Sequence, residues 1–304
     1  MTFKVFTSDQ LTNEAYHEES DHVSGSQLVE LMLDCPAQMR YGEKTETQAL
    51  AFGTLSHAMM LEPSRFDAEF VRGVEIVDGM MTSDAAIKAW LSERGIKGGS
   101  NKKFSELCEM VDATGESPLI YKREVEKLEF ANEGKTIVKP DEYDIVMQMR
   151  RVAMADPEYS EMITGGATEV SLFGELCGVK VKVRFDLLTA SGAIRDYKTT
   201  VSANPENFGR NAYDLGYWLK MALQHDMFCA AYGRPPESVG LLAQSKKAPY
   251  IAQDFALTEK QLAYGREQYQ TALRIYADCK SRDSWPAYGG GTMELQTPAW
   301  VKLD

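Results

Sequence analysis

Three charged side chains near the middle of the chain have the types and the spacing of a metal-binding site. Asp186 ends a stretch of alternating residues, and Asp196 and Lys198 lie in the next extended stretch. Two carboxylates suit Mg²⁺, a hard cation that takes carboxylate oxygens, keeps several waters and leaves positions for phosphate oxygens. A neighbouring ammonium group can then hold or polarise the attacking water or the scissile phosphate. The alternative is that these charges form a solvated strand face or a surface ion pair.

The segments that carry these residues predict a β-hairpin. Over 179–186 apolar and charged residues alternate, which is the pattern of a half-buried strand. The charged face of that strand carries Lys180, Lys182, Arg184 and Asp186. A Ser-Gly turn at 191–192 follows, and a second strand is predicted over 194–200. Asp196 and Lys198 are two residues apart and share a face, which an antiparallel hairpin would bring beside Asp186.

The composition limits the classes of function. The chain has 304 residues and a net charge of −12, which argues against a protein that coats nucleic acid, because such domains usually carry a basic footprint. A local basic lining can still attract phosphate within a Debye length of about 10 Å. No apolar run approaches the ~20 residues needed to cross a bilayer, and no signal-peptide pattern opens the chain. We therefore expect a cytoplasmic protein with no membrane partner.

The cysteines point to no further site. All five are scattered, and no two form a C-x-x-C pair. This spacing predicts neither a disulfide framework nor a zinc or iron–sulfur site.

The predicted fold is α/β, a small mixed sheet flanked by helices, in a single domain over 1–304. Residues 1–160 are predicted to be a mainly helical elaboration, 165–256 the sheet core, and 257–304 a C-terminal helix and tail. Capping boxes at Ser24 and Thr258 mark two helix starts. Helices are predicted over 26–33, 54–61, 85–94, 142–155, 213–232 and 259–281, and strands over 168–173, 178–188, 194–200, 239–243 and 250–256.

The order of the charged residues resembles a known enzyme core. A strand with Glu169, the hairpin with Asp186 and Asp196-x-Lys198, and a helix with Gln224 resemble the core of the PD-(D/E)XK nuclease superfamily. Within it, Phe52-Gly-Thr-Leu-Ser-His57 is similar to the segment that precedes the core in the RecE (exonuclease VIII) family of phage and prophage exodeoxyribonucleases. The resemblance runs from about residue 22 to the end, and it also includes Ser24-Gly-Ser26, Cys35-Pro-Ala37, Trp285-Pro286 and Pro298-Ala-Trp300.

The resemblance implies a role for each of these residues. Asp186 and Asp196 would bind Mg²⁺, with Mn²⁺ as a substitute, and Lys198 would be the catalytic lysine. The carbonyl of Tyr197 would be a further ligand, and His57, which lies near the metal, would with Glu169 bind a second Mg²⁺. The other expected site residues are Glu169 at the edge of the metal site, Gln224 and Tyr217 on the helix after the core, and Lys180, Lys182 and Arg184 as substrate-binding cations.

The resemblance also implies a function. The expected protein is a magnesium-dependent exodeoxyribonuclease that degrades duplex DNA ends from 5′ to 3′, with two metal ions, and leaves 3′ overhangs. Family members form homo-oligomeric rings and work with an annealing protein of the RecT type. Three alternatives stay open: a PD-(D/E)XK endonuclease or nuclease subunit, a non-catalytic scaffold that binds DNA ends, and an interaction module that needs no metal.

Overall fold

The computed structural model describes residues 3–43, 45, 47–297 and 301. Pro298-Ala-Trp300 therefore lies outside the described residues. A seven-stranded sheet forms the centre of the molecule, in the order β1-β5-β6-β7-β8-β9. Its strands are β1 (Lys4–Phe6), β5 (Ala167–Leu176), β6 (Val179–Leu188), β7 (Ile194–Thr200), β8 (Val239–Ser245) and β9 (Ala252–Ala256), and β2 (Val23–Ser24) pairs with β6.

The sheet is mixed, as the sequence predicts. β5, β6 and β7 form an antiparallel series, whereas β7 and β8 pair in parallel, as do β2 and β6. The predicted hairpin between β6 and β7 is confirmed, but it pairs only through Leu187 with Arg195 and Leu188 with Ile194. Beyond these pairs the two strands are not joined, so a fork opens between them, and Asp186 and Asp196 lie on its two sides.

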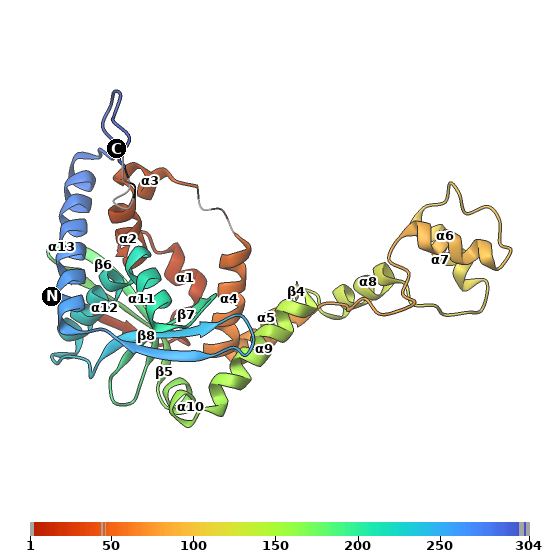
Figure 1. Cartoon of the computed structure of the whole chain (residues 1–304), viewed down its shortest axis with the longest axis horizontal. Coiled ribbons are helices and arrows are strands. Elements are labelled where there is room, and N and C mark those ends of the chain that lie inside the picture. The colour runs from red at the N-terminus through yellow and green to blue at the C-terminus, as the bar shows by residue number, and fades with distance from the viewer. Residues whose placement is uncertain (1–2, 44, 46, 298–300, 302–304) are drawn as a thin grey trace.

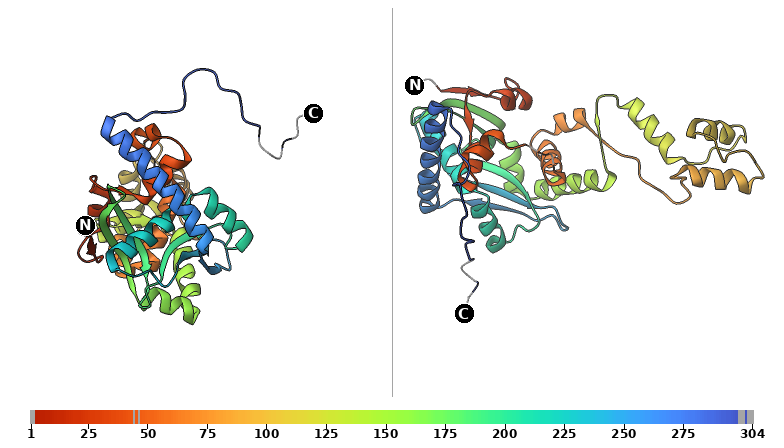
Figure 2. Two further views of the ribbon diagram at one scale, coloured as in Figure 1. Left: turned by 90° about the vertical axis from the view of Figure 1, so that its left-hand side faces the viewer. Right: turned by 90° about the horizontal axis from the view of Figure 1, so that it is seen from above.

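Helices cover both faces of the sheet (Figure 1). On one face, α2 (Gly25–Leu33), α12 (Tyr217–Tyr232) and α13 (Glu259–Arg282) pack on the main apolar core, which includes Phe185, Leu241 and Phe228. On the other face, α4 (Gln48–Leu61), α9 (Pro140–Ala155) and α10 (Pro157–Thr164) bury a second cluster around Leu187, Tyr197 and Leu242. Figure 2 shows α13 lying along one side of the sheet. The other body helices are α1 (Asn13–Glu18), α3 (Pro36–Tyr41), α5 (Pro63–Glu69) and α11 (Pro205–Asp214).

The strand β6 is buried on both faces, so the prediction of a half-buried strand is wrong. Lys182, Arg184 and Asp186 on the predicted solvent face are only 4%, 9% and 7% exposed. The physical reason is that α1 and the residues around it return to this face. Lys182 and Arg184 donate to backbone carbonyls of Leu11, Thr12, Tyr16 and Glu19, which lie more than 160 residues away in sequence.

An arm projects from the body between β3 (Phe70–Arg72) and β4 (Thr136–Val138), which form a separate parallel pair (Figures 1 and 2). It carries α6 (Asp84–Glu93), α7 (Phe104–Asp112) and α8 (Tyr121–Ala131). The arm has an apolar core of its own, made of Met81, Ile87, Leu91, Leu107, Cys108, Val111 and Ile120. The front half is thus mainly helical, but it also supplies β1 and β2 to the sheet, which extends beyond 165–256.

Three helix predictions need correction. The helix predicted over 213–232 is two helices, because Gly216 adopts a left-handed conformation with φ of 68° between α11 and α12. The helix predicted over 26–33 is followed at once by a further helix, α3, which begins at Pro36, where its missing N–H costs nothing. α4 begins at Gln48, six residues before the predicted start, with Thr47 as its N-cap. No helix in the described part of the chain is long and apolar enough to cross a membrane.

Candidate metal centre

The fork between β6 and β7 brings one of the predicted carboxylates beside the predicted histidine. Asp186 Oδ2 accepts a hydrogen bond from the backbone N–H of Tyr197 at 2.8 Å, which fixes the carboxylate across the fork. The same oxygen lies 3.7 Å from His57 Nδ1. His57 reaches this position from α4, where its ring makes an edge contact with the ring of Tyr197 at 5.3 Å between centroids.

Glu169 completes a group of three possible ligands. One atom each from His57, Glu169 and Asp186 lie within 4.8 Å of one another, close enough to share one ion. Glu169 has a φ of 55°, which is uncommon for a residue other than glycine. The ladder between β5 and β6 pairs Thr168 with Leu187 and Val170 with Phe185, but it is interrupted at Glu169 and Asp186. Such local strain is concentrated at functional sites, where the surrounding structure maintains it.

The charges around this triad fit a divalent cation. Carboxylate oxygens are the ligands that Mg²⁺ and Mn²⁺ prefer, and a neutral imidazole is a further nitrogen donor. Asp186 is buried, and among the described residues it has no lysine or arginine within ion-pair distance. A buried carboxylate without a cationic partner is costly, so the donor set and the charge both fit a bound cation.

The protonation of the triad follows from its burial. Burial, and secondly the neighbouring Asp186, raise the pKa of Glu169 to about 8. Burial lowers the pKa of His57, more than Asp186 raises it, so the imidazole stays neutral, the form that ligates metals. Glu169 also lies 3.6 Å from a guanidinium nitrogen of Arg184.

Asp196 is placed differently from the prediction. It is fully buried and lies outside the triad, and both of its carboxylate oxygens contact ammonium groups. Lys198 contacts Oδ2, and Lys220 lies 2.7 Å from Oδ1. Burial alone would raise the pKa of Asp196, but the two ammonium groups outweigh it and hold the pKa well below its usual range. Asp196 is therefore an ionised anchor for two lysines, and its role as a metal ligand stays a prediction.

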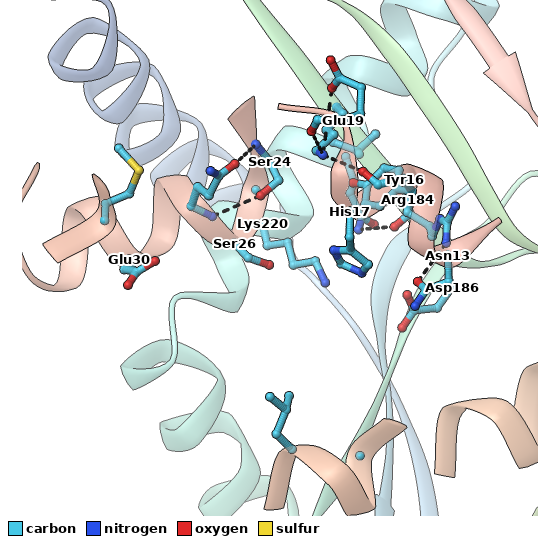
Figure 3. A pocket seen from close by; sticks show the side chains of 18 of the residues that line it. Asn13, Tyr16, His17, Glu19, Ser24, Ser26, Glu30, Arg184, Asp186 and Lys220 are labelled. Atoms are coloured by element: carbon cyan, nitrogen blue, oxygen red, sulfur yellow. Dashed lines mark hydrogen bonds and ion pairs between the residues drawn. The ribbon is translucent and has the colours of Figure 1, made fainter. Parts of the chain in front are cut away.

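A large cavity opens at the fork. Its volume is about 1110 Å³, and it is lined by His57, Glu169, Asp186, Lys198 and Lys220 among other residues. Figure 3 shows Asp186, Arg184 and Asn13 on one side of the cavity and Lys220 on the other. A cavity of this size, with convergent polar groups and shifted pKa values, is the usual form of an active site.

Comparison with known proteins places the chain in a family. Residues 24–297 match the family described as PDDEXK-like domain of unknown function (DUF3799). The chain belongs to this family. No curated protein matches the sequence.

The fold of this PDDEXK-like domain also occurs in solved structures. The crystal structure of a putative exonuclease from Eubacterium rectale superposes with a TM-score of 0.58 at 12% identity, over 95% of this chain and 96% of that one. At such identity the likeness concerns the fold. The structure of SSO0001 matches over 86% of this chain and 83% of that one at 12% identity, but its TM-score of 0.30 is too low to bear on the fold.

The three cationic side chains predicted to bind substrate all contact oxygen atoms of the PDDEXK-like domain itself. Lys180 is exposed and pairs with Asp21, outside the residues that line the cavity. Lys182 and Arg184 do line the cavity, but their donors are directed at protein oxygens. These contacts give the two buried cations a structural role, and phosphate binding by any of the three stays a prediction.

The helix after the core carries the two other predicted residues. The ammonium of Lys198 lies 5.5 Å from the ring centroid of Tyr217. Gln224 is 1% exposed, and its Nε2 donates to the carbonyl of Arg184 at 3.1 Å. Its Oε1 has no hydrogen-bond partner among the described residues, although Gln224 lines the cavity. Lys198 also donates to the carbonyl of Tyr197 at 3.2 Å, so that the predicted ligand carbonyl lies beside the lysine.

Sequence reasoning missed Lys220. It lies four residues before Gln224 on α12, and side chains at this spacing share one face of a helix. The spacing could have indicated that Lys220 lies on the same face of α12 as Gln224. It could not show that this face of the helix lies against Asp196.

The segments similar to the RecE family also come together. Ser24 forms the predicted capping box with Gln27 at the start of α2. The N–H of Ala37 donates to the carbonyl of Pro286 at 3.1 Å, and Arg40 lies over the ring of Trp285. Two motifs about 250 residues apart in sequence are thus in direct contact, and Arg40 and Trp285 are among the residues that line the cavity.

Proposed function

We propose that this PDDEXK-like domain is a divalent-metal-dependent deoxyribonuclease. The observation that carries the proposal is the triad of His57, Glu169 and Asp186, which lies with Lys198 on the wall of one cavity. The unbalanced charge of Asp186 supports a cation at the triad rather than a neutral hydrogen-bonded network. The order of these residues along the chain, which resembles that of PD-(D/E)XK nucleases, supports the same proposal.

The residues divide the chemistry among them. Bound Mg²⁺ or Mn²⁺ would polarise a phosphodiester oxygen and make a coordinated water more acidic. Asp186, oriented by the N–H of Tyr197, and Glu169 would hold the cation, with the neutral imidazole of His57 beside them. Lys198, anchored on Asp196 and the carbonyl of Tyr197, would orient the attacking water or stabilise charge on the phosphate.

The finer proposal is an exonuclease that acts from 5′ to 3′ on duplex DNA ends and leaves 3′ overhangs. It is supported by the resemblance to the RecE family and by the solved structure whose printed name is putative exonuclease. A second metal ion, a homo-oligomeric ring, a cytoplasmic location and an annealing partner of the RecT type belong to the same proposal. The second metal ion, the ring and the annealing partner follow from the resemblance, and the cytoplasmic location follows from the sequence pattern.

The test is cleavage of end-labelled linear duplex DNA in Mg²⁺, in Mn²⁺ and in EDTA, with a closed circle of the same sequence. We expect shortening from the 5′ terminus with either metal, none in EDTA, and no cutting of the circle. Asp186→Asn and Lys198→Met should each lower the rate by at least about 100-fold, because each removes a group that acts in the transition state. Lys127→Met, on the exposed surface of the arm and outside the cavity lining, is the matched control and should retain activity.

Each result separates the proposals. Cutting of the circle would identify an endonuclease and refute the exonuclease proposal. Binding of DNA ends without cleavage under every metal condition would favour a scaffold. Wild-type cleavage rates in folded Asp186→Asn would remove the triad from the mechanism.

A further inference from the structure

Lys220 is held in a defined position between two helices. It belongs to α12, its side chain is 24% exposed, and it lines the cavity at the fork. The aliphatic part packs on α2, where a methyl group added at Gly25 would lie 3.3 Å from Lys220 Cγ. Its ammonium therefore reaches Asp196 from the helix side of the sheet, whereas Lys198 reaches it along β7.

Each carboxylate oxygen of Asp196 lies beside an ammonium group, although Oδ2 accepts no hydrogen bond from the described residues. Lys220 occupies Oδ1 and Lys198 occupies Oδ2. If Asp196 is to join Glu169 and Asp186 around a divalent ion, that ion has to share the carboxylate with two ammonium groups, which repel it. Lys198 has two further partners, the carbonyl of Tyr197 and the ring of Tyr217. Among the described residues, Lys220 has no hydrogen bond or ion pair except the one with Asp196.

We propose that Lys220 is an internal counter-ion that competes with the divalent cation for Asp196 and so sets the metal affinity of the site. The inference rests on the proposed function, since it assumes a cation at the triad. Lys220 is a positioning residue in this scheme, because it acts through Asp196. It also keeps the buried carboxylate compensated when the site holds no cation, which avoids the cost of an unpaired buried charge.

The proposal predicts the sign of a substitution. Lys220→Met removes one positive charge from the neighbourhood of a divalent cation and frees Oδ1 of Asp196. We expect Mn²⁺ to bind about tenfold more tightly, or more, since like charges at this range repel strongly in a partly buried site. Lys220→Arg keeps the charge and should stay close to wild type. A purely structural lysine would give the opposite result, a less stable protein with weaker or unchanged metal binding.

The test is isothermal titration of Mn²⁺ alone into the full chain, without DNA, for wild type, Lys220→Met and Lys220→Arg. Asp186→Asn shows whether the measured binding belongs to the triad. The same substitution in an Asp196→Asn background tests the route, because the tightening should shrink when the contested carboxylate is absent. Thermal unfolding of each variant verifies the fold, and Lys220→Gln serves if the methionine variant does not fold.

The outcomes separate this inference from the proposed function. Tighter binding by Lys220→Met, with a smaller effect in the Asp196→Asn background, supports competition for Asp196. Unchanged or weaker binding by a folded Lys220→Met, while wild type still binds through Asp186, overturns the inference and leaves the proposed function intact. An equal effect in both backgrounds also overturns it, because the charge would then act without Asp196. If neither wild type nor variant binds Mn²⁺, the proposed function fails as well.

Discussion

For Lys182, a structural role and a substrate-binding role predict different results when the residue is replaced. Its ammonium is buried and donates to the carbonyl of Tyr16 at 2.6 Å and to the carbonyl of Glu19. Both carbonyls lie at the C-terminal end of α1, where helices leave such groups without intrahelical partners. Lys182 therefore joins α1 to β6 and contributes to the closure of this face of the sheet.

The substitution Lys182→Met should lower the free energy of unfolding by about 2–4 kcal/mol. A buried polar group that loses its partner costs about 1–3 kcal/mol, and two carbonyls lose theirs. Part of this cost is offset because methionine no longer has to bury a charge. Lys180→Met, two residues earlier on the same strand, is the control. The ammonium of Lys180 forms a solvent-exposed ion pair with Asp21, so the unfolding midpoint should hardly change.

Two measurements decide between the interpretations. Urea unfolding should show a lower midpoint for Lys182→Met at an unchanged slope. DNA affinity measured against salt should keep the wild-type salt dependence, because each phosphate contact contributes about 0.9 to that slope. A Lys182→Met protein with wild-type stability and a slope reduced by about 1 would refute the structural role and support a phosphate contact.

Two further predictions concern the packing of α12 against α13. Burial would raise the pKa of Asp226, but its two hydrogen bonds with Arg266 help to lower that pKa below the usual 3.8. The ionised carboxylate therefore stabilises the fold above pH 3.8, and this stabilisation is lost as the pH falls through the lowered pKa. Asp226→Asn should therefore destabilise the protein at pH 7 and match wild type near the acid limit in thermal unfolding. A methyl group at Gly265 would lie 2.2 Å from the carbonyl oxygen of Trp218, so Gly265→Ala should cost about 1–3 kcal/mol in urea unfolding. Gly209→Ala, with nothing within 4 Å, should be neutral or slightly stabilising, and equal effects of the two would contradict the packing argument.

Local patterns predicted the elements that carry the chemistry. β6 and β7 have the predicted bounds within one residue, and the capping boxes at Ser24 and Thr258 start α2 and α13 as expected. These features depend on residues only a few positions apart, where side-chain alternation and capping act. The short strands β1 and β2 were missed, because three and two residues are too few to show a period.

Contacts between distant residues were beyond the reach of such patterns. Nothing near Arg184 in sequence shows that Leu11, Thr12 and Asn13 return to satisfy its guanidinium. A charged strand face without such partners would be solvated, and the sequence alone favours that interpretation. The candidate site shows the same limit. The order of the family motifs along the chain pointed to His57, Glu169 and Asp186, but only the fold shows that Lys220 and Lys198 both contact Asp196.

The buried charges along β6 and β7 are better explained by positioning than by stability. Arg184 faces Glu169, Arg195 pairs with Asp254, and Asp196 holds two lysines. Buried ion pairs stabilise a fold little, because desolvation offsets their attraction. Their geometry, however, fixes each oxygen and nitrogen around the fork. Asp186 differs from these acids, since its Oδ2 is oriented by the N–H of Tyr197 and faces a neutral imidazole rather than a fixed cation. Among the described residues Asp196 contacts two lysines, whereas Asp186 has no lysine or arginine within ion-pair distance, so we expect an added cation to bind at Asp186 first.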